Sequence, residues 1–152
     1  MNIFALDTNP ETCAQFHVDT HIVKMPLETA QMLCTVTQQY GGEAKYKPTH
    51  ANHPCTRWAA ENSGNYGWLV QLGLALCAEY THRYGKVHAC EAVIRSVSVP
   101  LYGMRVAARG SFALAMPDQY QQVDTVASYR HYYREAKASL HKWKKRQPPQ
   151  WI

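Results

Sequence analysis

Residues 17–33 of the chain read HVDTHIVKMPLETAQML, and this stretch decides the fold. Polar side chains recur in it at steps of four, three, four and three residues, at His17, His21, Lys24, Glu28 and Gln31. On an α-helix these positions share one face, and the apolar residues between them predict that the rest of the helix is buried. A titratable face on a buried helix is costly unless it lines a cleft or meets partners. We interpret it as a candidate active site, with a solvated outer stripe as the alternative.

The helical pattern around this stretch extends in both directions. Thr8 and Glu11 have the spacing of a capping box, and Gly41 with Gly42 ends the pattern. Pro26 lies inside it and should kink or split the helix, for which Asp19 or Thr20 offers a fresh cap. If the split falls before His21, His17 leaves the polar face.

The remaining sequence predicts more helices and few strands. The expected order is a loop over 41–54, a helix from Pro54, a longer helix over 65–84 closed by Gly85, a short helix over 88–96, an irregular stretch over 97–123, a helix over 124–145 capped by Asp124, and a tail over 146–152. The expected fold is therefore mainly α, with one compact helical domain over residues 1–152 and irregular connecting loops.

Composition limits the class of protein. The 152 residues are 46% hydrophobic with a mean hydropathy of −0.42, and no apolar run approaches the ~18 residues of a membrane span. No signal peptide is visible. Five cysteines stand singly, which favours buried free thiols in a reducing compartment. We expect a cytoplasmic protein without a membrane partner.

The charge is unevenly distributed along the chain. The net charge is +5, yet residues 1–44 hold one base and five acids, so the basic excess lies downstream. A basic surface beside a titratable helix favours a polyanion such as double-stranded DNA, whereas a solubilising tail is the alternative. The candidate phosphate contacts are His53, Arg57, Arg83, Lys86, Arg130, Lys142, Lys144 and Lys145.

Three kinds of chemistry fit the polar helix. His17 and His21 have the spacing of a helical zinc pair, for which Glu28, His50 or His53 could supply a third ligand. Alternatively, an amine attacks a sugar carbon and forms a Schiff base, with Glu28 as acid, base or stabiliser of a cation. The amine is Lys24 or the chain terminus at Met1, since α-amines lose their proton more readily than lysine. In the third case Lys24 and Glu28 are an ordinary ion pair.

Short motifs in this order resemble the pyrimidine-dimer DNA glycosylase family of the phage endonuclease V type. They are Asp19-Thr-His21-Ile-Val with Glu28 seven residues after the histidine, His53-Pro54 before the middle helix, Glu79-Tyr-Thr-His-Arg83-Tyr-Gly85 at its end, and Arg146-Gln-Pro-Pro-Gln-Trp151 in the tail. The resemblance implies a small helical glycosylase with abasic-site lyase activity and no cofactor, in which Glu28 is the catalytic carboxylate.

The chain departs from the family pattern at two places. The family nucleophile is the α-amine exposed when Met1 is removed before a small residue, but Asn2 is large, so the resemblance implies the amine of Met1 itself. Ala30, Gln31 and Met32 stand where the family has basic residues. Recognition of pyrimidine dimers is therefore not implied.

We interpret the chain as a base-excision enzyme that acts on a damaged or modified base in DNA. Its expected catalytic set is Glu28, His21, Lys24, His17 and Met1. The alternatives are a non-catalytic basic DNA-binding module and a metal-dependent hydrolase that uses His17 and His21.

Overall fold

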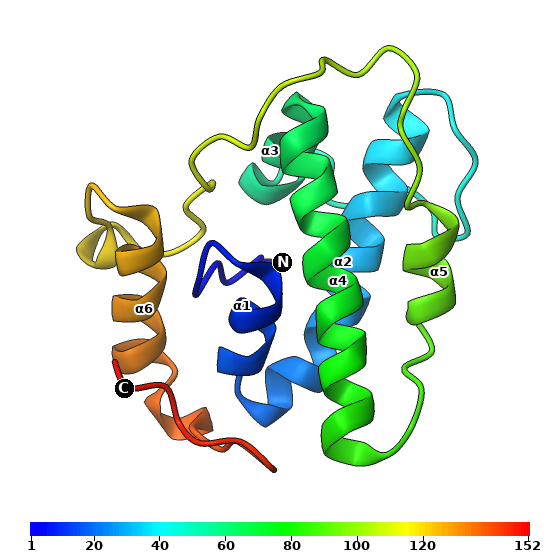
Figure 1. Cartoon of the computed structure of the whole chain (residues 1–152). Helices are drawn as coiled ribbons and strands as arrows, with labels where there is room; N and C mark the ends of the chain where they lie inside the picture. The colour runs from blue at the N-terminus through cyan, green and yellow to red at the C-terminus, as the bar shows by residue number, and fades with distance from the viewer.

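A long central helix, α4 (Ser63–Tyr84), organises the computed structural model, which describes residues 1–152. Helices α1 (Pro10–Phe16), α2 (Asp19–Gln39), α3 (Pro54–Glu61) and α5 (Glu91–Ser96) all pack against it (Figure 1). Asn62 caps its first turn, and Gly85 ends it in the left-handed conformation at φ 69°. The helix expected from the spacing of apolar residues before Gly85 is confirmed.

The second half of the chain is mostly irregular. After α5 it passes over the start of α4, where the Ser63 N–H donates to the Arg105 carbonyl at 2.9 Å. It then forms the 3-10 turn η1 (Asp118–Tyr120) and continues through α6 (Thr125–Ala136) to the 3-10 turn η2 (Ala138–Leu140). Figure 1 shows α6 on the far side of α1 from α4. No strand forms, so the mainly α fold is confirmed. No helix combines the length and the apolar composition that a bilayer span requires.

The helix at the start of the chain splits into α1 and α2. His17 and Val18 are extended, with ψ of 138° and 158°, so the break falls before His21. The cap predicted at Asp19 or Thr20 is wrong: the N-cap of α2 is Val18, whose apolar side chain cannot accept a hydrogen bond, and Asp19 is the first helical residue. Pro26 is accommodated inside the helix. The cap of α1 is Asn9 rather than Thr8: its side chain accepts the N–H of Thr12 at 3.0 Å.

The first residues of the chain thread through the interior. Ile3 to Leu6 are buried without forming a helix or strand. Phe4 adopts φ 39°, which is rare for a residue with a side chain, and its ring stacks on His21 at 4.5 Å between centroids. Because the helix is interrupted between α1 and α2, the ring of His21 can contact this segment in the core.

His17 and His21 are core residues. The Nδ1 of His17 lies 2.8 Å from the Cys13 carbonyl oxygen, and that of His21 lies 2.8 Å from the Tyr133 hydroxyl. Burial lowers the pKa of His17 to about 4 and that of His21 to about 3, so both rings are neutral at neutral pH. All five cysteines are likewise buried and free, as expected.

The last helix is shorter than the sequence predicts. α6 ends at Ala136, not near residue 145, because the chain is drawn back onto α1, α2 and α4. The Trp143 indole donates to the Phe16 carbonyl at 2.9 Å, and the backbone N–H of Lys144 donates to Asp19 at 2.8 Å. The basic residues after Leu140 therefore lie on an extended C-terminal segment.

A buried ionic network joins this segment to the helices. Arg83 is 0% exposed and donates to the carboxylates of Glu79 and Asp19 at 2.8 and 2.9 Å. Burial favours neutral Glu79, but bonds from Arg146 and Arg83 outweigh it and lower the pKa of this carboxyl. The charges are thus mutually compensated in the interior.

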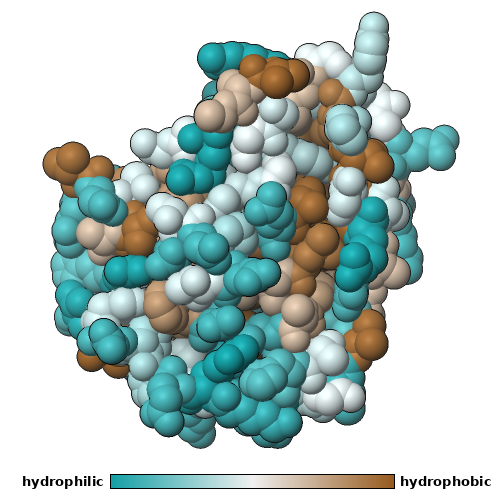
Figure 2. Space-filling model, viewed as in Figure 1, coloured by the Kyte–Doolittle hydropathy of each residue, from teal (hydrophilic) through white to brown (hydrophobic).

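The surface has a polar end and an apolar side. Figure 2 shows the face of Figure 1, with hydrophilic atoms gathered at the lower end, where α4 ends and the C-terminal segment passes. Apolar atoms gather along the side of α4 that faces α5. The polar end of the molecule is thus the end that the buried network ties together.

Replacing Arg83 by Met should lower the free energy of unfolding by about 3–5 kcal/mol, because the buried Glu79 and the partly buried Asp19 each lose an ion pair and two backbone carbonyls lose their donor. The matched control is Arg95→Met, which breaks the exposed pair with Glu91 and should cost less than about 1 kcal/mol. Urea unfolding at pH 7 measures both. Equal losses would show that the buried network contributes no more than a surface pair.

Acidification should destabilise the protein through the two buried histidines. Their rings stay neutral in the fold, while the unfolded chain takes up protons below about pH 6.5, so stability is complete above that pH and is lost toward pH 4. His17→Gln should reduce the pH dependence of the unfolding free energy by up to about 1.4 kcal/mol per pH unit. Urea unfolding at pH 7, 6, 5 and 4 tests this, and an unchanged slope would contradict it.

Candidate active site

The carboxylate of Glu28 is the centre of the candidate site. Its side chain is largely buried, with the residue 7% exposed in the middle of α2. Oε2 accepts the backbone N–H of Asn2 at 3.0 Å and lies 3.6 Å from the terminal amine of Met1, while Oε1 lies 3.1 Å from Nζ of Lys24. One carboxylate therefore meets the start of the chain and a lysine at once.

The start of the chain is held at Glu28 by the Asn2 side chain. Its Oδ1 accepts the N–H groups of Ile3 at 2.7 Å and Phe4 at 3.0 Å, and its Nδ2 donates to the Ala115 carbonyl at 2.8 Å. Neither Asn2 nor Ala115 was predicted as a site residue. Every residue has a backbone carbonyl, so the sequence cannot indicate which one Asn2 contacts.

His53 borders the site from α3. It caps this helix, with Nδ1 accepting the N–H of Cys55 at 3.1 Å, so its proton resides on Nε2. Burial, the terminal ammonium and His50 lower the pKa of His53, and Glu28 and a hydrogen bond with the Met1 backbone oppose this. His53 thus places a largely neutral ring beside the amine and the carboxylate.

Lys24 differs from the other groups in its exposure. Its side chain is 66% exposed, whereas that of Glu28 is 10% exposed. The pair has the i, i+4 spacing of an ordinary helical ion pair. The Met1 side chain is 3% exposed, so the start of the chain is packed against Glu28. The two candidate amines therefore differ in how firmly the structure holds them at the carboxylate.

The other members of the expected catalytic set lie apart from Glu28. His21 is seven residues away on α2, about 10 Å along the axis, and is occupied by Phe4 and Tyr133. His17 precedes α2 and faces the core. The polar face predicted from the sequence is thus divided. His17 and His21 lie in the core, whereas Lys24 and Glu28 lie beside the chain terminus.

The geometry does not favour the metal-dependent hydrolase. No group of three or more His, Cys, Asp or Glu side chains gathers in a way that could hold a metal ion. His17 and His21 each use Nδ1 for a bond within the protein, and their ring centroids are 6.3 Å apart. The pair predicted from its spacing is separated by the α1–α2 break.

The predicted phosphate contacts fall into two groups. Arg83 is corrected: it is enclosed, and its guanidinium is used by Glu79, Asp19 and two backbone carbonyls. Arg130 is half-buried and bonds to Leu6 and Asp7. The members that reach the surface are Arg57, Lys86, Lys142, Lys144 and Lys145, with His53 half-buried.

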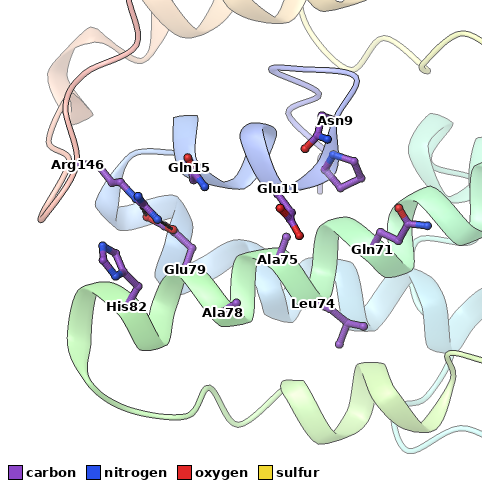
Figure 3. Close-up of a pocket in the computed structure, with 11 residues that line it drawn as sticks. Asn9, Glu11, Gln15, Gln71, Leu74, Ala75, Ala78, Glu79, His82 and Arg146 are labelled. Atoms are coloured by element: carbon purple, nitrogen blue, oxygen red, sulfur yellow. Dashed lines mark hydrogen bonds and ion pairs between the residues drawn. The ribbon is translucent and has the colours of Figure 1, made fainter.

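A large groove of the molecule lies elsewhere. It has a volume of about 580 Å³ and runs between α1 and α4. In Figure 3, Glu79 and Arg146 point toward each other at one end of it, and Asn9 lies at the other. Glu28 is not among its lining residues, so groove size alone would have pointed away from the carboxylate and the chain terminus.

Comparison with known proteins identifies the family of this chain. A search of curated proteins and a search of solved structures each gave no match. A family model described as pyrimidine dimer DNA glycosylase matches residues 1–92, a range that contains Met1, Glu28 and His53. The chain therefore belongs to the pyrimidine dimer DNA glycosylase family.

Proposed function

We propose that this chain excises a damaged or modified base from double-stranded DNA, with the N-terminal amine as nucleophile and Glu28 as the catalytic carboxylate. Family membership supports a DNA glycosylase function and DNA as the substrate. The observation that carries the finer proposal is the carboxylate of Glu28, 3.6 Å from the terminal amine and 3.0 Å from the next backbone nitrogen.

The reaction begins with attack of the neutral amine on C1′ of the deoxyribose. The bond between C1′ and the base breaks, and the base leaves with the bonding electron pair. Loss of the amine proton and opening of the sugar ring then give a Schiff base. A carboxylate beside the amine can accept this proton and stabilise the cationic sugar, which is the role we assign to Glu28.

The same intermediate gives the proposed abasic-site lyase activity. Removal of a C2′ proton from the Schiff base expels the 3′ phosphate and cuts the strand. The position of Glu28 supports this second role, because its carboxylate lies 3.6 Å from the amine that carries the sugar and can accept the proton there.

The nucleophile has two forms in this geometry. In the chain as printed it is the amine of Met1. If Met1 is removed, the backbone nitrogen of Asn2 becomes the amine, already 3.0 Å from Glu28. Both forms place an α-amine at the carboxylate, and mass spectrometry of the trapped product distinguishes them.

We assign the DNA phosphates to the exposed basic residues. Arg57 lies one turn after His53 on α3. The three lysines of the C-terminal segment lie at the start of α2, because the Lys144 N–H bonds to Asp19, nine residues and about 13 Å of helix from Glu28. This separation matches a few base pairs of duplex. Lys24 adds a charge at the site itself.

Glu28→Gln should abolish base release, with a loss of about a hundredfold or more, because the amide can neither accept the proton nor stabilise the cation. DNA affinity should stay within about threefold, since repulsion is removed and no phosphate contact is lost. Single-turnover release and fluorescence anisotropy measure the two quantities, with Glu43→Gln on the exposed loop as the control. Equal loss of release and affinity would contradict the catalytic assignment.

Borohydride should trap a covalent adduct between the protein and DNA. The panel contains duplexes with an abasic site, uracil, a thymine dimer or a modified pyrimidine, and mass spectrometry locates the adduct. We expect it on the terminal residue, Met1 or Asn2, and Lys24→Ala should still form it. An adduct on Lys24 alone would move the nucleophile to α2. If no adduct and no base release occur while a Lys142, Lys144 and Lys145 triple alanine variant loses DNA affinity, the chain is a binding module.

A further inference from the structure

We propose that Asn2 is a positioning residue, and that the segment over residues 113–116 acts through it to hold the terminal amine at Glu28. The proposal rests on the proposed function, because it concerns the same amine. It adds a part of the chain outside the family match, which ends at residue 92.

The Asn2 side chain is enclosed, and both of its polar atoms are hydrogen-bonded. The residue is 7% exposed, and its oxygen accepts two backbone N–H groups. Its amide nitrogen donates to the Ala115 carbonyl at 2.8 Å, across 113 residues of sequence. An amide is the side chain that suits this position, since the oxygen must accept while the nitrogen donates.

These bonds fix the backbone from which the amine projects. The oxygen of Asn2 closes a tight turn over Ile3 and Phe4, in which Phe4 is held at φ 39°. The turn directs the N–H of Asn2 onto Glu28, and only one residue of chain then separates Asn2 from the amine. With Asn2 fixed, Met1 retains few positions in which its amine can leave the carboxylate.

The far end of the contact is anchored in turn. The Tyr129 hydroxyl of α6 donates to the Ala113 carbonyl at 2.6 Å, and Tyr129 is itself buried. Ala115 is therefore held two residues from a fixed point. A continuous series of contacts runs from α6 through residues 113–115 to Asn2 and the amine. The proposal is that this series, rather than the family-matched residues alone, sets the reactive geometry.

Two substitutions separate the parts of this contact, and both keep a large residue at position 2 so that Met1 stays in place. Asn2→Leu keeps the approximate volume and removes every side-chain hydrogen bond. Asn2→Asp keeps the acceptor for the turn but replaces the donor to Ala115 with an oxygen. Asn9→Ala is the control, since it removes one capping bond of α1 away from Glu28. Mass spectrometry confirms the terminal residue of each.

The readout is the single-turnover rate of borohydride trapping on duplex DNA with an abasic site, normalised to the folded fraction. Displacing a reacting group by about 1 Å can cost about a hundredfold in rate. We expect a loss of tenfold or more in Asn2→Leu and a smaller loss in Asn2→Asp, with DNA affinity and the Asn9→Ala rate unchanged. A merely structural role would lower the folded fraction and leave the normalised rate intact.

Each outcome bears on one proposal or on both. If wild type traps DNA and both Asn2 variants trap it at the wild-type normalised rate, the positioning role is overturned while the proposed function stands. If wild type forms no adduct on its terminal residue, the proposed function fails, and the positioning role fails with it. If the normalised trapping rate falls in Asn2→Leu but not in Asn2→Asp, the positioning role belongs to the turn alone. The part of the proposal that concerns the 113–116 segment is then overturned.

Discussion

The guanidinium of Arg83 is the interaction on which the rest of the structure depends. It reaches the carbonyls of Gln15 and His17 on one side of the α1–α2 break and the carboxylate of Asp19 on the other. An extended break inside a bundle leaves carbonyl groups without helical partners, and one buried cation satisfies them. Glu79 compensates its charge and also binds Arg146 at 2.9 Å. The corner between two helices and the end of the chain thus share one ionic network.

This corner decides where the candidate site lies. Because α2 starts anew after the break, the N-terminal segment can pass beside it and bring Met1 to Glu28. Phe4 fills the space over His21, which makes that histidine part of the core. Of the polar face predicted from the sequence, Lys24 and Glu28 are left to form an ion pair beside the chain terminus. The positions before them, His17 and His21, are used for packing.

The sequence predicts most of the fold because its signals are local. Gly85, Pro54 and Asp124 mark helix ends, and each does so in the structure. The prediction that the last helix extends to residue 145 was wrong. Contacts of Trp143 and Lys144 with distant residues override the helical pattern of this part of the sequence. Arg83 was misinterpreted as a surface base, although its spacing to Glu79 was a visible sign of an ion pair.

The candidate site was predictable only in part. Glu28 and Met1 were predicted from the polar helix as well as from the family resemblance, and the structure places their carboxylate and amine 3.6 Å apart. The contact of Asn2 with Ala115 joins residues 113 positions apart through a backbone carbonyl. No spacing rule covers such a pair, since neither residue type nor periodicity records it. His53 carried a helix-start signal, but its nearness to the terminal amine depends on how α3 packs on α2.

The interior position of the chain terminus has a consequence for assembly. Residues 2–4 are among the last that can take their places in the fold. Their partners include the Ala115 carbonyl and, through Phe4, the rings of Tyr132 and Tyr133. Contacts so distant in sequence form slowly. Met1 therefore meets the Glu28 carboxylate only when the fold is closed.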